Sequence, residues 1–187
     1  MLRRPAAGFT FIEAVVSLAL IAVLSGMAAP AMLHIIERNK ASAGINWLAR
    51  GIHLARMSAI DHGVMVTLCP TEDDASCGGD WHERVMLFTD SNEDHTVNGS
   101  DTVVAYLDFP HDEGTLTWRS FRNRQYLQIT PMGFTNSQNG NFVYCAASQE
   151  DAYSRQLVIN VQGRLRNSRG RNSDGVVVDS NGRVLRC

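Results

Sequence analysis

The chain has 187 residues, of which 44% are hydrophobic, and a formal net charge of −2. Leaving aside an apolar N-terminal stretch, about 150 residues remain, enough for one domain that buries its own core. The sequence contains no internal repeat and no low-complexity stretch, which excludes repeat architectures and chains dominated by disorder.

The near-neutral total hides an uneven distribution of charge. Residues 69–113 contain twelve acidic residues and one base, Arg84, whereas residues 116–187 contain ten arginines and four acidic residues. Lysine occurs once, at Lys40. An arginine-rich surface favours planar, bidentate partners such as phosphate or carboxylate. A GC-rich genome produces the same bias, so the composition leaves both explanations open.

The first predicted element is an apolar helix near the N-terminus. From Phe9 to Leu33 the only ionisable side chain is Glu13. About 25 residues of helix span roughly 37 Å, which is enough to cross a bilayer. Arg3 and Arg4 precede this stretch. Positive charge before an apolar span predicts that the amino end stays cytoplasmic and that the rest of the chain is exported.

The residues around Gly8 stand in an unusual order. An ordinary secretory signal places its apolar core before a small-x-small cleavage site, whereas here Gly8 precedes the apolar run, so cleavage after it leaves that run on the mature protein. The run GFTFIE from Gly8, followed by an uncharged stretch that reaches Pro30, resembles the class III signal of type IV pilins and type II secretion pseudopilins. The resemblance implies that a prepilin peptidase cuts between Gly8 and Phe9 and methylates the new amine of Phe9.

Glu13 and Pro30 stand out within the apolar stretch. A carboxylate near the hydrocarbon core costs a few kcal/mol on insertion scales unless it finds a partner. The resemblance implies that Glu13 meets the charged amine of a neighbouring subunit's first residue and sets the register of assembly. The alternative is an interfacial Glu13 that reaches outward to water. Pro30 cannot donate to the helix ladder, which predicts a kink or local melting of the helix there.

The helix is predicted to resume after Pro30 and to stop at His62 and Gly63. Apolar residues recur at three- and four-residue spacing and predict an amphipathic stripe that packs on the protein's own domain. The stripe consists of Ile45, Leu48, Ile52, Ala55 and Ala59, widened by Trp47 and Leu54. The helix end ARMSAI at residues 55–60 and the strand VTLCP at residues 66–70 resemble the FimT and FimU minor pilins and the H-type pseudopilin of type II secretion.

Short strands between turn residues are predicted beyond the helix. They are expected at Val64–Cys69, Val85–Thr89, Thr102–Leu107, Thr115–Arg119, Leu127–Ile129, Phe142–Cys145 and Gln156–Val161. Runs of strands after one long helix predict an α+β fold with antiparallel sheets packed on the helix end, and the resemblance implies two small sheets. We expect a leader at residues 1–8, a transmembrane and filament-core helix at 9–33, its amphipathic continuation at 34–62 and a periplasmic β-rich domain at 63–187.

Four cysteines in an exported domain predict disulfides, with three pairings possible. Cys69 and Cys77 bracket a short polar loop, which favours a local bridge and leaves Cys145 to pair with Cys187. A zinc site is the competing use, but the spacing matches no C-x-x-C pattern.

An acidic segment between the second and third predicted strands has some features of a calcium loop. Asp90-Ser91-Asn92-Glu93-Asp94 and the later Asp101 place oxygen ligands at alternate positions. However, the sixth position is His95 where the loop needs glycine, and the twelfth is Asp101 where it needs a bidentate glutamate. A solvated acidic turn is therefore favoured over a calcium site.

The segment GRLR at residues 163–166 is the main candidate binding site. If the preceding residues form a strand, Arg164 and Arg166 project to the same side. The segment resembles the G-R-x-R motif of FimT proteins, whose arginines bind DNA during natural transformation. The resemblance implies that Arg164 and Arg166 contact phosphates, assisted by Arg169 and Arg171, without regard to base sequence. The alternative is solvated arginines on a structural minor pilin.

A second basic cluster contains Arg119, Arg122 and Arg124, with Phe121 and Tyr126 interleaved. The aromatic rings would offer stacking surfaces to single strands, but core positions in neighbouring strands are favoured for them. The histidines show no ligand spacing, and no Ser-His-Asp arrangement, P-loop or H-E-x-x-H motif is present. We therefore predict no enzyme, no cofactor and no metal site.

These features together predict a minor pilin of the FimT/FimU group, anchored in the inner membrane with its domain in the periplasm. It is expected to assemble through its N-terminal helix with other pilins at or near the tip of a type IV pilus, after processing by prepilin peptidase, and to present a DNA-binding surface. The alternative is an H-type pseudopilin of a type II secretion system. Four cysteines and the GRLR segment favour the pilus.

Overall fold

A computed structural model describes residues 8–187, apart from residues 112, 169, 174, 180–181 and 186, and leaves out the side chains of residues 27 and 30. The chain divides into two compact units, Met1–Glu37 and Arg38–Cys187. One long apolar helix, α1 (Phe11–His62), is followed by two antiparallel sheets. This arrangement confirms the predicted α+β fold.

In the first unit, α1 begins with a side-chain cap. The Thr10 hydroxyl oxygen accepts a 3.3 Å hydrogen bond from the backbone N–H of Glu13, which satisfies one of the free donors at the helix start. The helix continues without interruption through residue 30. Of the two expected effects of Pro30, local melting is absent because the residues around it keep helical geometry, and the kink stays a prediction.

In the second unit, α1 supplies one wall of the core. The predicted stripe Ile45, Leu48, Ile52, Ala55 and Ala59 is buried, as are Ala41 and Trp47. Leu54 is 40% exposed, so its assignment to the stripe was wrong. It lies two residues past Ile52, about 200° around the helix, and faces away from the core.

The predicted end of the helix is confirmed. Helix α1 ends at His62, and Gly63 follows with φ +67°. The N–H of Gly63 donates a 3.0 Å hydrogen bond to the carbonyl of Ala59. A glycine in the left-handed region is the usual residue at this position because it has no Cβ to clash with the last turn.

The first sheet has the strand order β3-β2-β1-β5. All its neighbouring strands are antiparallel, and the central strand β1 pairs Leu68 with Leu87 on one side and with Leu127 on the other. Its strands are β1 (Val66–Pro70), β2 (Arg84–Thr89), β3 (Val103–Asp108) and β5 (Leu127–Ile129).

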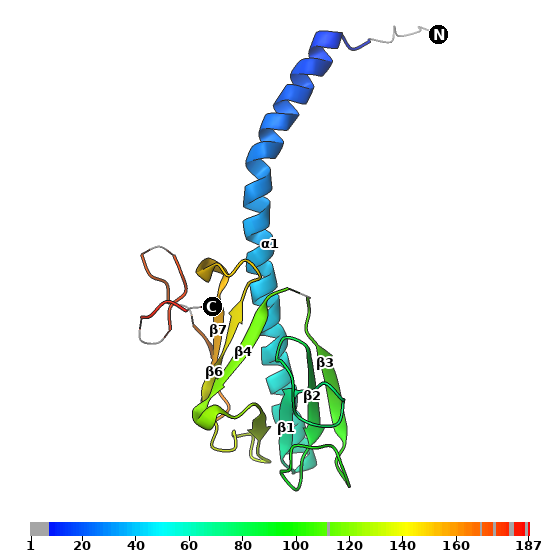
Figure 1. Ribbon diagram of the computed structural model, residues 1–187, viewed down its shortest axis with the longest axis vertical. Coiled ribbons are helices and arrows are strands. Elements are labelled where there is room, and N and C mark those ends of the chain that lie inside the picture. The colour runs from blue at the N-terminus through cyan, green and yellow to red at the C-terminus, as the bar shows by residue number, and fades with distance from the viewer. Residues whose placement is uncertain (1–7, 112, 169, 174, 180–181, 186) are drawn as a thin grey trace, which may run out of the picture. The chain divides into compact units, whose positions relative to one another are not determined.

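The second sheet has the order β4-β6-β7-β8 and is also antiparallel. Its strands are β4 (Thr115–Ser120), β6 (Gly140–Cys145), β7 (Arg155–Ile159) and β8 (Leu165–Asn167). Two short 3-10 turns, η1 (Phe121–Asn123) and η2 (Asp151–Tyr153), precede β5 and β7. Strand β8 was not predicted. Figure 1 shows strands of both sheets beside the C-terminal part of α1.

The core between α1 and the sheets is rich in aromatic rings. Trp118 stacks on Phe142 with centroids 4.2 Å apart, and Trp81 meets Phe142 edge-on at 4.8 Å. Trp47 of α1 packs edge-on against Phe109 at 5.2 Å. All three tryptophans of the chain are buried in this core. Offset and edge-to-face pairs of this kind add to the gain from buried area, so the cluster ties the helix to the sheets.

Candidate functional site

The N-terminal residues named from the sequence lie at the start of α1. Gly8 precedes the helix, and the Phe9 side chain is 85% exposed. The Glu13 carboxylate is exposed and forms no hydrogen bond or ion pair with any residue that the structure describes. The Thr10–Glu13 spacing is also that of a helix capping box. The T-x-x-E pattern predicts this local role, which was not among the expectations from the sequence.

The N-terminal part of α1 exposes nearly all of its apolar side chains. In the described chain, one helix is long and apolar enough to cross a membrane, and it is α1. Its exposed side chains include Ile12, Leu18, Leu20, Ile21, Val23, Leu24 and Leu33. Soluble proteins rarely expose an apolar surface of this extent to water. The helix therefore requires lipid or the helices of other chains around it.

Arg164 and Arg166 lie at the edge of the second sheet. Arg166 belongs to β8, where it pairs with Val158 of β7, and Arg164 stands one residue before the strand. Both side chains are exposed, whereas Leu165 between them is half-buried and packs against the core. The alternation expected from the sequence therefore holds, and the two guanidinium groups face away from the core.

Gly163 has a structural role that is independent of any ligand. It closes the β7–β8 turn (residues 160–164) with φ +71°, and its N–H donates a 2.9 Å hydrogen bond to the carbonyl of Asn160. The Asn160 side chain accepts a further 2.9 Å bond from the N–H of Arg164. The first residue of GRLR is thus a turn glycine that sets where β8 and its arginines begin.

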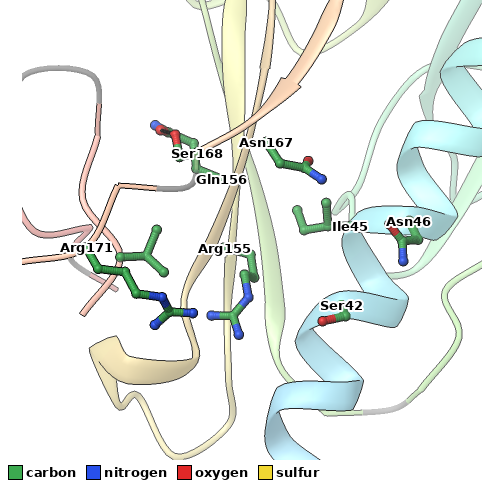
Figure 2. Close-up of a pocket in the computed structure, with 9 residues that line it drawn as sticks. Ser42, Ile45, Asn46, Arg155, Gln156, Asn167, Ser168 and Arg171 are labelled. Atoms are coloured by element: carbon green, nitrogen blue, oxygen red, sulfur yellow. Dashed lines mark hydrogen bonds between the residues drawn. The ribbon is translucent and has the colours of Figure 1, made fainter. Parts of the chain in front are cut away.

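Of the other two predicted arginines, the structure describes Arg171 alone. Arg169 lies outside the described residues. Arg171 lines a cavity of about 380 Å³ together with Arg155, and Figure 2 shows their guanidinium groups pointing into the same space. The cavity also contacts Ser42, Ile45 and Asn46 of α1.

Arg155 is the residue of this region that sequence reasoning missed. Its guanidinium is half-buried and donates to the carbonyls of Ser154 at 2.8 Å and Ala152 at 3.4 Å. Burial, and then repulsion by Arg171 and Arg38, lowers the pKa of Arg155. The sequence signal was weak, because Arg155 and Arg171 lie 16 residues apart, in no common local pattern, and meet only through the fold.

The acidic loop (residues 90–101) is built around the buried carboxylate of Asp90. That carboxylate accepts hydrogen bonds from the Thr67 hydroxyl at 2.6 Å, from the Gln128 side chain at 3.3 Å and from the Asp94 N–H at 3.1 Å. Side-chain donation from Asn98, followed by the Thr96 N–H and the Asn92 side chain, lowers the pKa of Asp94. Hydrogen-bond donors of the protein therefore occupy the carboxylate oxygens of both Asp90 and Asp94.

Asp90, Asp94 and Asp101 bring carboxylate oxygens within 4.8 Å of one another. His95, at the position where a calcium loop needs glycine, adopts φ +63° and stacks on Tyr126 with centroids 3.8 Å apart. The turn is thus made without glycine. The donors to Asp90 explain the acidic turn as a structural element of the loop.

Both predicted disulfide pairings are present in the structure. Cys69 is joined to Cys77, and Cys145 to Cys187, each with Cα atoms 5.5 Å apart. Cys69 sits with Met86 and Phe88 in a small second core. The first bridge closes the loop after β1, and the second ties residue 187 to the end of β6.

The second basic cluster differs from its prediction. Phe121 is 59% exposed and carries the Arg122 guanidinium 5.5 Å above its ring, so its assignment to the core was wrong. Phe121 lies in the short turn η1, which has no buried residue, and not in a strand. Tyr126 is half-buried against the second core, and Arg124 lies 5.8 Å above it.

Comparison with known proteins places the chain in a family. Residues 45–163 match the family described as "Type II transport protein GspH", and residues 3–29 match "Prokaryotic N-terminal methylation motif". No curated protein matches the sequence.

Two solved structures are similar to the chain. The first is the type IV minor pilin FimU of Pseudomonas aeruginosa (strain PAO1), with 20% identity, a TM-score of 0.50, and coverage of 71% of this chain and 90% of that one. The second is the minor pseudopilin EpsH from the Type 2 Secretion System of Vibrio cholerae, with 14% identity, a TM-score of 0.43, and coverage of 67% and 94%. The similarity to FimU supports the fold. Since the first family match spans more than half of the sequence, the protein belongs to the GspH family of type II transport proteins and carries an N-terminal methylation motif.

Proposed function

We propose that this chain is a minor pilin of a type IV pilus. Cleavage between Gly8 and Phe9 removes a leader at residues 1–8, and the amine of Phe9 is methylated. Residues 9–33 hold the protein in the inner membrane, 34–62 continue the helix, and 63–187 form a periplasmic domain. The observation that carries this proposal is the exposed apolar part of α1, which holds a single carboxylate and lies in a chain with both family matches.

Assembly exchanges one apolar environment for another. In the membrane, lipid covers the apolar side chains of α1, and in a filament the helices of neighbouring subunits cover them. The Glu13 carboxylate, which bonds to no described residue of its own chain, then meets the charged amine of a neighbouring subunit's Phe9. This pairing removes the cost of an uncompensated charge and fixes the axial register.

The proposed minor pilin also binds DNA without regard to sequence, at or near the filament tip. Arg164 and Arg166 are the phosphate contacts and Arg169 assists, whereas Arg171 points into the cavity with Arg155. The support is the exposure of both side chains on one side of β8, with no ion pair to a described residue. A guanidinium fork matches phosphate oxygens and carries no information about bases.

The test is DNA binding by the full chain in detergent, with two unrelated duplexes, across a salt series. We expect equal affinity for both duplexes and a loss of affinity as salt rises. The double variant Arg164→Gln, Arg166→Gln should weaken binding and reduce the slope of log K against log salt by about 1.8, since each phosphate contact contributes about 0.9.

The matched control is Arg119→Gln, Arg122→Gln, which removes the same charge from the second basic cluster. It should leave the slope nearly unchanged. Equal losses in the two double variants would show that only total charge matters. Absence of binding at low salt would leave Arg164 and Arg166 as solvated surface on a structural pilin.

The second candidate function is that of a pseudopilin in a type II secretion system. The family match, whose description names type II transport, favours it. A strain that lacks this chain should lose surface pili and DNA uptake if the first proposal holds. Loss of folded proteins from the medium, with pili retained, would assign the chain to secretion. Complementation with the wild-type chain controls for effects on neighbouring genes.

A further inference from the structure

The cavity that contains Arg155 and Arg171 is not lined by the proposed DNA contacts Arg164 and Arg166. It is lined by Asn167 and Ser168 from the end of β8. The cavity is therefore separate from the surface formed by Arg164 and Arg166.

The two guanidinium groups in this cavity are held in place by the backbone. Arg155 donates to the carbonyls of Ser154 and Ala152. Arg171 donates to the carbonyl of Gly175, and its own backbone forms an isolated bridge with buried Val177. The arginines are thus pre-organised, so a ligand would bind without ordering two long side chains.

The cavity is polar and positively charged. Two guanidinium groups share it with the hydroxyl and amide side chains of Ser42, Asn46, Asn167 and Ser168, over the apolar groups of Ile45 and Val177. No described acidic residue lines it, and neither arginine forms an ion pair with a described residue. Repulsion from Arg171 and Arg38 contributes to lowering the pKa of Arg155, which is the situation that a bound anion relieves.

We propose that Arg155 and Arg171 form a binding site for a phosphate group in this cavity. Paired guanidinium forks match the oxygens of a tetrahedral oxyanion, and the amide side chains of Asn46 and Asn167 line the same cavity. The cavity, at about 380 Å³, has room for a substituent on the phosphate as well. This proposal does not depend on DNA binding at β8.

Two sources of the phosphate group share this chemistry. One is free inorganic phosphate. The other is the headgroup of an anionic phospholipid, because Arg38 and Ser42 follow Leu33, the last residue of the apolar stretch, within about ten residues of chain. A membrane that holds this stretch keeps those residues near its surface, where basic pockets bind anionic headgroups.

The first experiment measures phosphate binding by titration calorimetry on the full chain in detergent, with chloride at equal ionic strength as the reference. We expect saturable binding of inorganic phosphate at one site. Arg155→Gln should weaken it by at least about tenfold, the loss expected for one charge-assisted contact. Arg50→Gln, an exposed arginine on α1 outside the cavity, should leave the affinity unchanged.

A second variant distinguishes loss of the binding site from misfolding of the domain. Ser42→Asp places a carboxylate on an exposed helix position that lines the cavity, and it leaves both arginines intact. It should abolish phosphate binding while the melting temperature without phosphate stays close to that of the wild type. Arg155→Lys should retain charge but lose the fork and bind with intermediate affinity.

The sources are separated by thermal unfolding in nanodiscs of phosphatidylglycerol or phosphatidylcholine. A higher melting temperature in phosphatidylglycerol that Arg155→Gln removes identifies the headgroup, and equal melting in both lipids with phosphate binding intact identifies the free ion. Phosphate that binds no better than chloride, or unchanged affinity in Arg155→Gln, would overturn the site. Loss of DNA affinity in Arg155→Gln without phosphate binding would assign this arginine to the DNA surface instead.

Discussion

Gly163 packs so closely on Gly133 that a Cβ atom at position 163 would lie 2.8 Å from the carbonyl oxygen of Gly133. Its backbone also has φ +71°, in the region that disfavours residues with a Cβ. Both effects act against Gly163→Ala, which we expect to destabilise the domain by about 2–3 kcal/mol. The measurement is thermal or denaturant unfolding of the full chain in detergent.

Gly99→Ala is the matched control for this variant. Gly99 has φ +55°, but nothing lies within 4 Å of its added Cβ. It should lose only the backbone term of about 1 kcal/mol. Equal losses at the two positions would show that the contact between Gly163 and Gly133 contributes nothing to stability.

Removing the buried carboxylate of Asp90 should destabilise the acidic loop. In Asp90→Ala, the Thr67 hydroxyl and the Gln128 amide lose their acceptor, and buried donors without a partner cost about 1–3 kcal/mol. We also expect that chelation of divalent cations leaves the wild-type melting temperature unchanged, because protein donors already occupy the Asp90 oxygens. A rise in melting temperature on adding calcium that Asp101→Asn abolishes would contradict this interpretation.

The loop between Cys69 and Cys77 should weaken in acid. The Ser76 hydroxyl and N–H, with the Ala75 N–H and the Thr71 hydroxyl, donate to the Asp73 carboxylate and hold its pKa well below its usual range. A lowered folded-state pKa means that the stabilisation is present above the unfolded pKa of about 3.9 and is lost as the pH falls through the lower folded value.

The stability advantage of the wild type over Asp73→Asn should therefore be constant near neutral pH and shrink below about pH 4. Melting temperatures measured from neutral pH to acid provide the test. Asp80→Asn, which removes an exposed carboxylate with no hydrogen bond from a described donor, should show no such convergence. An advantage of the wild type over Asp73→Asn that persists in strong acid would sink the argument.

The two disulfides should contribute unequally to stability. Their sequence separations are 42 residues for Cys145–Cys187 and 8 for Cys69–Cys77. In the chain-entropy model the longer loop is worth about 4 kcal/mol and the shorter about 2.5 kcal/mol. The double variant Cys145→Ser, Cys187→Ser should thus melt lower than Cys69→Ser, Cys77→Ser. Intact-mass analysis that finds four free thiols in the exported protein would contradict both bridges.

Replacing Glu13 should affect assembly and leave membrane insertion intact. If its carboxylate pairs with a neighbour's N-terminal amine, Glu13→Ala should insert normally and enter filaments poorly. Thr10→Ala is the control, because it removes the hydroxyl that accepts from the Glu13 N–H but keeps the carboxylate. Quantifying the protein in the membrane and in sheared filaments provides the measurement. Normal incorporation of Glu13→Ala would refute the register argument.

Much of the fold could be predicted because periodicity reports burial directly. The stripe from Ile45 to Ala59 and the run Leu127–Ile129 follow from spacing and side-chain type. Strand β8 was missed because it is only three residues long and has one apolar residue, Leu165, between two arginines. The core position predicted for Phe121 was wrong because this residue lies in the short turn η1 after β4 and not in a strand.

The two candidate sites also differ in how far the sequence could predict them. Arg164 and Arg166 are neighbours in the chain, so a local pattern finds them. Arg155 and Arg171 meet across a cavity only after β7, β8 and α1 have packed, and no local pattern reports a contact of that kind. The Thr10 cap could have been predicted from the T-x-x-E pattern of residues 10–13. It was missed because the same residues resemble a processing signal.

The three buried tryptophans have a practical consequence for spectroscopy. Trp47, Trp81 and Trp118 all lie in the core of the second unit, and the apolar stretch from Phe9 to Leu33 contains no tryptophan. Intrinsic fluorescence therefore reports on the globular domain alone, whether the helix is in detergent, lipid or a filament. A red shift of the tryptophan emission indicates unfolding of that domain. An unchanged emission spectrum during extraction from a membrane indicates that the domain stayed folded.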